Sequence, residues 1–322
     1  MTSLCSDHQR LEFEANSTRP LSSGGTVLFH LNPPELPKAI ASLRRSQLRR
    51  KKLIGYWAWE LPHAPANWLK SIALVDEIWV PSRFVSNALS PASHIHVVPH
   101  PVTNPKASAL QREDFGIPRD PSTFLVVFDA LSSVARKNPF AAIEAFDASG
   151  GKNSQLVIKM QNGDRVPRLK RRIVERVAGR RNIIIWDEAI PLADLYALIQ
   201  CSTAIVSLHR SEGFGLVLAE AMLLGRPVIA TGWSGNIDFM NENNSLPIPY
   251  RLVSVEDPQE LYAPYQLWAE PSIKSAGLAM RTLATSPELA EKLGHAASTL
   301  DFVGRFNEAV CSTGLGGRLA AE

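Results

Sequence analysis

Apolar residues in the second half of the chain form short uninterrupted runs, and between these runs they recur every three or four positions. The runs have strand length and are 124–128, 155–159, 182–186, 204–208 and 227–231. The periodic stretches predict helices over 139–148, 167–178, 192–199 and 216–224. Strands that are apolar on both faces and alternate with helices predict a parallel, doubly wound sheet. Ligands of such sheets bind at the carboxyl ends of the strands, so the loops there are candidate sites.

The first half of the chain predicts a smaller set of strands. These strands are expected at 26–31, 53–59, 77–80 and 94–98, with a strongly basic helix over 40–53. Closely spaced prolines after the last strand indicate a linker. We therefore expect a loose leader (1–25), an N-terminal domain (26–105), a linker (106–120), a C-terminal domain (121–298) and a C-terminal tail (299–322).

Composition narrows the class of protein. The chain has 322 residues, 45% apolar and 20% charged, which suits two globular domains. A net charge of +3 is too weak to indicate nucleic acid. Three widely spaced cysteines argue against a disulfide framework and for a reducing, cytoplasmic compartment. The sequence has no apolar run long enough for a membrane span, and its first residues do not resemble a secretory signal.

The segment SEGFGLVLAE, residues 211–220, carries the strongest chemical signal. It follows a predicted strand and opens a predicted helix. Gly213 and Gly215 allow a ligand to approach the backbone, and N–H groups at a helix N-terminus favour an anion. Glu220 lies on an otherwise apolar helix, where a carboxylate requires hydrogen-bond donors such as ribose hydroxyls. A tight turn with a solvated Glu220 is the alternative, but Glu212 and Glu220 together favour a nucleotide site.

A second segment, DALSSVARKNP, follows the strand at 124–128. We expect Asn138 to cap the next helix and Pro139 to begin it. Arg136 and Lys137 then precede the positive end of that helix, which is unfavourable for cations unless an anion binds between them. A diphosphate would meet this requirement. A solvated basic turn is the alternative.

Weaker signals occupy other loops. Trp186 and Asn236 follow predicted strands and would suit a base and a sugar nucleotide, although either loop could be purely structural. The His94, His96 and His100 spacing lacks a nearby carboxylate or cysteine, so we expect no metal site. The basic segment Arg44–Lys52 is either a solvated helix face or a contact for anionic lipid headgroups at the inner face of the plasma membrane.

The segments LHRSEGFGLVLAEAMLLGRPVIATGWSGN and ARKNPFAAIEAF resemble the group 1 glycosyltransferase domain, with the E-x7-E signature of retaining family 4 enzymes. GYWAWELPHAPANW, VDEIWVPSRF and VVPHPV resemble the acceptor-side domain of bacterial polysaccharide glycosyltransferases. The resemblance implies a GT-B fold: two Rossmann-like domains with parallel, doubly wound sheets. The N-terminal domain is short or incomplete, because the family's first strand and its Gly-rich loop are not evident.

The resemblance also implies roles for single residues. Glu212, Lys137 and Arg136 are expected to be catalytic, with Arg136 replacing a family arginine whose position is taken by Ser132. Residues expected to bind the donor are Gly213, Phe214, Gly215, Leu216, Glu220, Ser132, Ser133, Trp186, His209 and Asn236. His100, Glu60 and His63 are expected on the acceptor side.

The function implied is metal-independent hexosyl transfer, with retention, from a GDP- or UDP-linked sugar to a polysaccharide or lipid-linked glycan such as lipopolysaccharide. The nucleotide sugar is the substrate, and no cofactor is expected. A shortened, non-catalytic homologue that binds nucleotide or glycan as a partner subunit is the main alternative. A sugar-nucleotide epimerase, which shares the architecture, is a third.

Overall fold

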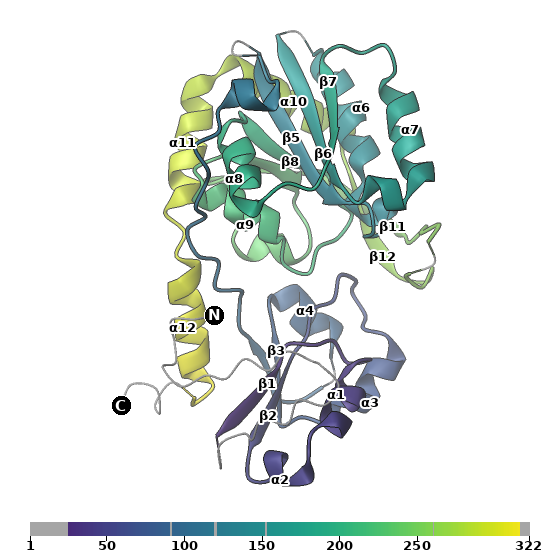
Figure 1. The fold of residues 1–322 in the computed structure, drawn as a ribbon, viewed down its shortest axis with the longest axis vertical. Helices are drawn as coiled ribbons and strands as arrows, with labels where there is room; N and C mark the ends of the chain where they lie inside the picture. The colour runs from purple at the N-terminus through teal and green to yellow at the C-terminus, as the bar shows by residue number, and fades with distance from the viewer. Residues whose placement is uncertain (1–24, 91, 119–120, 152, 260, 316–322) are drawn as a thin grey trace. The chain divides into compact units, whose positions relative to one another are not determined.

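The computed structural model describes residues 25–90, 92–118, 121–151, 153–259 and 261–315 (Figure 1). Contacts within the chain divide it into two units. The first contains residues up to Pro101 together with those from Asp301, and the second is Val102–Leu300. The predicted leader, 1–25, lies outside the described residues except for Gly25. In the described part of the chain, no helix combines the length and apolar character needed to cross a membrane.

The second unit is built on six parallel strands in the order β10-β9-β8-β5-β6-β7. Their bounds are β5 (Ser122–Asp129), β6 (Ser154–Gln161), β7 (Ile183–Asp187), β8 (Ala204–Ser207), β9 (Val228–Thr231) and β10 (Leu246–Ile248). The parallel sheet predicted from the apolar runs is confirmed. Strand order reverses beside β5, because β6 lies on one side of it and β8 on the other. Such a switch point opens a crevice at the carboxyl ends of the strands.

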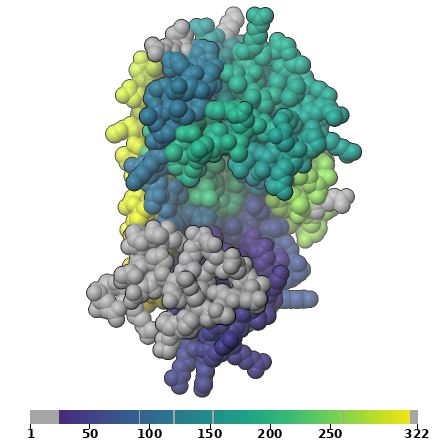
Figure 2. All heavy atoms as spheres, in the orientation of Figure 1, coloured from purple at the N-terminus to yellow at the C-terminus, as the bar shows by residue number. Residues whose placement is uncertain are grey.

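Helices cover both faces of this sheet. One face packs on α6 (Pro139–Ser149), α7 (Pro167–Val177), α10 (Ile273–Thr285) and α11 (Pro287–Ser298), which share a buried core with alternate strand residues such as Phe124 and Ile158. On the other side lie α8 (Leu192–Gln200) and α9 (Leu216–Leu223), in front of the sheet in Figure 1. Figure 2 shows α7 and α8 forming much of this unit's surface on the viewer's side.

Shorter elements complete the second unit. They are α5 (Val134–Lys137), the 3-10 turns η2 (Arg112–Phe115), η3 (Gly163–Arg165) and η4 (Gly235–Asp238), and an antiparallel pair, β11 (Tyr250–Ser254) and β12 (Leu267–Pro271). The pair is anchored where Arg210 Nε donates to Glu270 Oε2 at 2.6 Å. The sequence pattern did not indicate this hairpin.

The first unit has four parallel strands in chain order: β1 (Thr26–Phe29), β2 (Lys52–Tyr56), β3 (Glu77–Val80) and β4 (Ile95–Val97). Right-handed crossovers between strands in this order place the connecting segments on one face. These segments include α1 (Leu36–Ser42), η1 (Ala66–Trp68), α3 (Leu69–Ile72) and α4 (Arg83–Ala88). Their apolar residues, among them Leu36, Trp68 and Val85, form one core with the strands.

The opposite face of this sheet is covered by α12 (Phe302–Ser312), from the segment that the sequence assigned to a tail. Phe306 and Val310 pack against Ile54, Tyr56 and Trp79 in a separate buried cluster. The Asp301 side chain caps the helix by accepting from Gly304 N at 2.7 Å. A sheet with all its crossovers on one face thus acquires its second wall from a segment about 200 residues later in sequence.

The basic helix predicted over 40–53 is wrong. This stretch contains the end of α1, the short α2 (Arg45–Leu48) and the first residues of β2. The backbone becomes extended at Leu43, and Arg50 has a φ of 62°. Like charges at successive helical positions repel, and α2 has no buried residue to offset this cost. Lys52 and Leu53 instead pair with β1.

Candidate functional site

The candidate site of the second unit lies at the switch point of its sheet. The segment after β5 carries Arg136 and Lys137, and the segment after β8 carries His209 and Glu212. Because β5 and β8 are neighbours, the two segments meet although they are about 75 residues apart. The structure therefore brings together residues that sequence analysis assigned to separate loops.

The segment after β5 folds differently from the prediction. Arg136 and Lys137 lie in the short helix α5, which Ser133 caps by accepting from Arg136 N at 3.2 Å. Pro139 begins the next helix, α6, as predicted, and the N-cap residue of this helix is Asn138. Its backbone is left-handed, with φ 53°, and its side chain makes no capping hydrogen bond. Asn tolerates this conformation better than most residues, so it forms the corner between α5 and α6.

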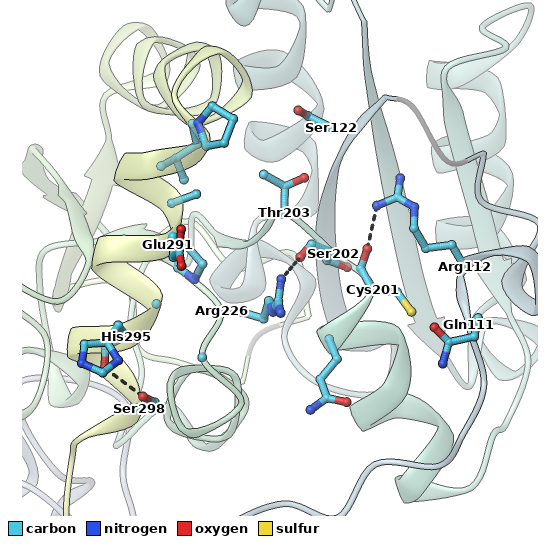
Figure 3. Close-up of a pocket in the computed structure, with 17 residues that line it drawn as sticks. Gln111, Arg112, Ser122, Cys201, Ser202, Thr203, Arg226, Glu291, His295 and Ser298 are labelled. Carbon is cyan, nitrogen blue, oxygen red and sulfur yellow. Dashed lines mark hydrogen bonds between the residues drawn. The ribbon is translucent and has the colours of Figure 1, made fainter.

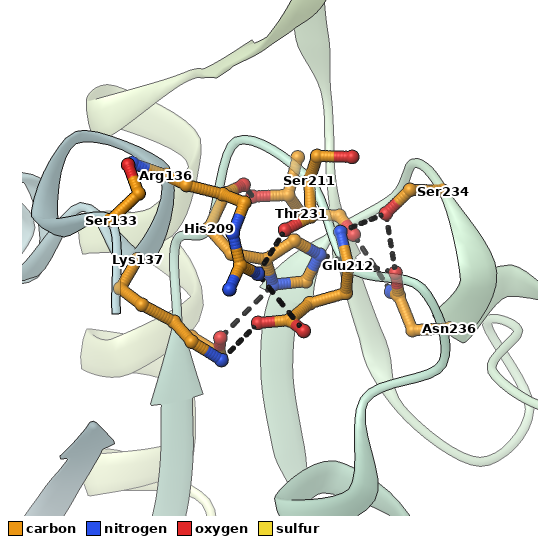
Figure 4. A network of polar contacts seen from close by, with 10 residues as sticks. Ser133, Arg136, Lys137, His209, Ser211, Glu212, Thr231, Ser234 and Asn236 are labelled. Carbon is orange, nitrogen blue, oxygen red and sulfur yellow. Dashed lines mark hydrogen bonds and ion pairs between the residues drawn. The ribbon is translucent and has the colours of Figure 1, made fainter. Parts of the chain in front are cut away.

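A buried carboxylate joins the two basic side chains (Figure 4). Lys137 Nζ lies 2.5 Å from Glu212 Oε1, and Arg136 Nη1 lies 3.2 Å from Glu212 Oε2. Arg136 also donates to the carbonyl of Ser211 at 3.0 Å. The side chains of Arg136 and Glu212 are 6% and 13% exposed. Two cations thus share one carboxylate, and the group keeps a net charge of +1.

The environment of Glu212 favours its ionised form. Burial alone would raise the pKa of this carboxyl, but the charges of Lys137 and Arg136 outweigh it, and the pKa falls to about 2. The carboxylate therefore stays charged at any physiological pH. It can hold the two cations in place until another anion competes for them.

A hydrogen-bonded network fixes the loop that carries Glu212 (Figure 4). The fully buried His209 lies 3.0 Å from the Ser207 hydroxyl through Nδ1 and 3.1 Å from Asn236 Oδ1 through Nε2. Burial lowers the pKa of His209, so the ring is neutral. Ser234 accepts from Glu212 N at 2.8 Å. His209 and Asn236 therefore position the loop from inside, and the contacts explain why both are buried.

Two glycines allow the loop its tight course. Gly215 has φ 97° and directly precedes α9, whose first turn has no side-chain cap. The first N–H groups of such a helix lack intrahelical acceptors and favour an anion. At Gly235, a Cβ would overlap with the carbonyl of Gly213, and Gly235 N donates to Glu212 O at 2.8 Å. Sequence analysis singled out Gly213 and Gly215, whereas the need for Gly235 appears only in three dimensions.

Glu220 lies on α9 and accepts from the Tyr196 hydroxyl on α8 at 2.9 Å. Burial raises the pKa of Glu220 above its ordinary value. Among the described residues, no hydrogen bond or ion pair links Glu220 to the Glu212 group. Sequence analysis missed Tyr196, because only the packing of α8 on α9 brings the two side chains together.

The other residues expected to bind the donor occupy varied surroundings. Ser133 is buried and donates to Asp257 Oδ1 at 3.2 Å, while Ser132 begins the turn into α5. Trp186 lies on the edge strand β7 with Phe115 packed edge-on against it. Phe214 is buried against Phe239, whereas Leu216 is exposed.

Lys159 is a residue that sequence analysis missed near Trp186. Its buried ammonium donates to the carbonyl of Glu188 at 2.6 Å, directly after β7. Burial lowers its pKa, partly offset by Asp187 and Glu188. A lysine inside a strand pattern gives no chemical signal by itself, so only the structure reveals that it fixes this loop.

The first unit has an aromatic group at the carboxyl ends of its strands. The Tyr56 hydroxyl donates to Val98 O at 2.8 Å and lies 3.1 Å from His100 Nδ1. His30, the residue after β1, stacks on Tyr56 with ring centroids 4.8 Å apart. Burial and the neighbouring His30 lower the pKa of His100 to about 4. His100 was expected here, but Tyr56 and His30 were not.

The other two acceptor-side candidates lie in the loop after β2. Glu60 is half-buried, and the His63 carbonyl accepts from Trp59 Nε1 at 2.9 Å. Neither observation tests a role in binding an acceptor. Their acceptor role therefore remains a prediction.

Comparison with known families identifies the second unit. Residues 126–266 match the family model described as "Glycosyl transferases group 1". This part of the chain is therefore similar to a group 1 glycosyl transferase domain. The match covers both segments of the switch-point site, and it confirms the resemblance read from the sequence. No curated protein sequence matches the chain.

Solved structures extend the likeness over most of the chain. A glycosyltransferase from Rickettsia africae is 16% identical, with a TM-score of 0.65 over 92% of this chain and 77% of that one. HepE from Anabaena, in complex with UDP and glucose, is 14% identical, with a TM-score of 0.64 over 90% and 77%. Both are similar in fold, and the predicted GT-B class of two Rossmann-like domains is confirmed.

TarM is a further structural neighbour, described from S. aureus. It is 14% identical, with a TM-score of 0.64 over 92% of this chain and 55% of its own. The chain therefore spans about half the length of TarM.

Proposed function

We propose that this chain is a glycosyltransferase that moves a hexosyl group from a nucleoside-diphosphate sugar to a glycan, with retention of configuration. Its group 1 domain supports the general activity. HepE and the pneumococcal O-GlcNAc transferase GtfA were solved with UDP, which makes a UDP-sugar the first donor to test. GDP-sugars are the second choice.

The observation that carries this proposal is the group of Arg136, Lys137 and Glu212. Two cations and one carboxylate leave a charge of +1, next to the uncapped first turn of α9. A diphosphate offers more negative charge than Glu212 and matches the fork of an arginine. On donor binding, Lys137 and Arg136 would contact phosphate oxygens, and Glu212 would be released toward the sugar.

The reaction needs a site that stabilises the departing nucleoside diphosphate. The bond between the sugar C1 and the phosphate oxygen breaks, and an acceptor hydroxyl forms a new bond to C1 on the same face. Lys137, Arg136 and the α9 amides would stabilise the negative charge that develops on the phosphate. The acceptor proton passes to the departing phosphate oxygen. Glu220 would hold the ribose hydroxyls.

The same charges account for a reaction without a metal ion. In this proposal Arg136 and Lys137 provide the positive charge that a bound cation would otherwise supply. Turnover is therefore expected to be unchanged by EDTA. A loss of turnover that Mg²⁺ or Mn²⁺ restores would contradict this part of the proposal.

On the acceptor side, we propose a polysaccharide or lipid-linked glycan, bound with the help of His100, Glu60 and His63. The exposed basic residues of Arg44–Lys52 would hold the enzyme at an anionic membrane surface. The remaining candidates of the second unit, Trp186 among them, would contact the base of the donor.

The test combines donor binding with turnover. Calorimetry with UDP, GDP and their hexose conjugates identifies the nucleotide, and release of the nucleoside diphosphate measures turnover. Lys137→Ala should lower turnover by about 10²–10³-fold. Lys274→Ala, which removes an exposed lysine of the same unit, is the matched control and should change nothing.

Each outcome discriminates between the candidate functions. Unchanged turnover in Lys137→Ala would refute the site. Binding of nucleotide without turnover on any donor and acceptor would favour the non-catalytic homologue. Conversion of the donor sugar to its epimer without an acceptor would favour an epimerase.

A further inference from the structure

A second pocket lies at the opposite edge of the second unit's sheet, where strands β5, β8 and β9 begin (Figure 3). Its volume is about 770 Å³, within the ~300–1,000 Å³ range of ligand sites. The switch-point site lies at the carboxyl ends of these same parallel strands. The two sites are therefore separated by the length of the strands.

Arg226, the residue two before β9, lies in this pocket between α11 and the turn after α8 (Figure 3). The only hydrogen bond of its side chain to the described residues is a long one, 3.4 Å from Nη1 to the carbonyl of Ser202. Its buried Nε has no partner. Burial lowers the pKa of Arg226, and Cys201 is the only group found to oppose that effect. Among the residues that the structure describes, no carboxylate forms an ion pair with this partly buried guanidinium.

A neighbouring arginine shows what a structural role looks like in the same pocket. Arg112 donates to the carbonyls of Cys201, Pro118 and Pro121 and to the Thr123 hydroxyl, at distances of 2.8–3.1 Å. Its guanidinium joins three segments of the chain. Arg226 makes no such set of contacts among the described residues. A structural role therefore does not explain why a charged side chain lies there.

Two elements flank Arg226, the end of α9 and the helix α11, and they pack tightly against each other. Gly225 has φ 70° and ends α9, and Gly294 of α11 packs on it so closely that any Cβ at Gly294 would overlap with the Gly225 carbonyl. Arg226 N donates to Ala221 O at 3.0 Å, which fixes the start of its side chain. The pocket therefore does not have to be formed by the ligand.

The rest of the lining indicates the kind of ligand. An arginine fork suits a phosphate or carboxylate. Hydroxyl and amide side chains surround it, including Ser122, Thr203 and Gln200, together with the exposed carboxylate of Glu291. These groups can donate to or accept from sugar hydroxyls. Apart from the imidazole of His295, no aromatic ring is found among the described residues of the lining, so a stacked base has no platform.

We propose that this pocket is a second ligand site, which binds an anionic carbohydrate, either a sugar phosphate or a uronate, with its charged group on Arg226 and its hydroxyl groups toward Glu291. The site differs from the donor site in position and in residues. It binds its ligand whether or not the chain transfers sugars.

Calorimetry on the full chain tests this proposal with glucose 6-phosphate, glucuronate, inorganic phosphate and glucose as probes. Glucose 6-phosphate or glucuronate should bind, and the tighter of the two identifies the anion. Arg226→Gln should weaken that binding at least about tenfold, whereas Lys137→Ala at the donor site should not change it. Equal binding to Arg226→Gln and the wild type would overturn the proposal, as would no binding of either anionic sugar.

Two further measurements separate ligand binding from a structural role. Glu291→Gln should weaken glucose 6-phosphate but not inorganic phosphate, and equal affinity of the wild type for these two probes would overturn the carbohydrate part. In the ligand-free protein, Arg226→Gln should not lower the melting temperature, because a charge without a counter-ion stabilises little. A clear drop, unlike that of the exposed control Arg171→Gln, would show that Arg226 is structural and overturn the proposal.

Discussion

The two parallel sheets of this protein differ in the side chains that lie at their carboxyl edges, where the strands end. In the second unit that edge holds two cations on a buried carboxylate, Arg136 and Lys137 with Glu212. In the first unit it holds the rings of His30, Tyr56 and His100. One edge is charged and the other is aromatic, although both sheets are built of parallel strands.

Under the proposed function, this difference suits the two edges to different ligands. A charged edge suits a diphosphate, which brings negative charge into a partly buried place. An edge of rings with a neutral histidine suits an uncharged glycan, which needs apolar faces and a hydrogen-bond acceptor. Variants of the second unit should therefore change donor binding, and variants of the first should change transfer alone.

The largest effect is expected from Glu212→Gln, which leaves the Arg136 charge buried without a carboxylate. At neutral pH we expect this variant to lose about 3–5 kcal/mol of unfolding free energy, measured in urea. The exposed Glu175→Gln on α7 is the control and should lose almost nothing. Equal losses in the two variants would mean that the ion pairs of Glu212 with Arg136 and Lys137 do not stabilise the second unit.

Acid should abolish the difference between Glu212→Gln and the wild type. The pKa of Glu212 is about 2 in the folded chain, against an ordinary value of 4.5. The stabilisation is therefore complete above about pH 4.5 and disappears as the pH falls toward 2. Urea midpoints measured across this range should converge, and parallel curves would contradict the assigned cause.

The next effect is in the first unit. His100→Gln should lower transfer to the acceptor by about 10²-fold, because a small displacement of the acceptor hydroxyl that the ring helps to bind can cost this much, while calorimetry should show unchanged affinity for the nucleotide. Because the pKa of His100 is about 4, wild-type transfer should fall only as the pH drops through that value. His94→Asn, at an exposed site with positive φ, is the control. Weaker nucleotide binding in His100→Gln would contradict the expectation that variants of the first unit change transfer alone.

A smaller effect sharpens the description of the donor side. Glu220→Gln should weaken nucleotide binding about tenfold, because a charged acceptor for ribose hydroxyls becomes neutral. Burial raises the pKa of Glu220, so affinity should start to fall at a higher pH than an exposed glutamate would give. Tyr196→Phe removes only the supporting hydroxyl and should cost less. The reverse order, measured by calorimetry, would assign the ribose to another residue.

The smallest effect concerns the membrane. Arg50→Gln should weaken binding of the chain to vesicles rich in anionic lipid by about fivefold, corresponding to about 1 kcal/mol. Arg171→Gln removes an exposed charge from the second unit and is the control. Equal effects would mean that net charge, rather than the Arg44–Lys52 segment, controls binding, and no binding at all would refute the membrane contact.

The sheet of the second unit was predictable because burial on both faces leaves continuous apolar runs, such as Phe124–Phe128. The helices between the runs followed from their periodicity. The switch-point group was also predictable, since glycines and charges next to a strand end have few structural explanations. In the first unit all four strands were predicted, but the basic helix was wrong, because charge repulsion and pairing with β1 outweigh helix propensity in the stretch 40–53.

What the sequence concealed depends on contacts between distant segments. Tyr196 reaches Glu220 only through the packing of α8 on α9, and Gly235 is required only by the Gly213 carbonyl beside it. Asn138 is the N-cap residue of α6, as predicted, but its left-handed backbone and missing side-chain cap follow from the short helix α5 before it, which the sequence pattern did not indicate. Local propensity describes what a residue can do, and tertiary contacts decide which of these options it uses.

The helix α12 determines the order in which the two units can finish folding during synthesis. Its residues leave the ribosome after the whole second unit has emerged, yet they wall in strands made at the start. One apolar face of the first unit's sheet stays uncovered until α12 has been translated. The second unit can fold as soon as its own residues have emerged. Nascent chains that stop before Phe302 should therefore bind chaperones through the first unit rather than through the second.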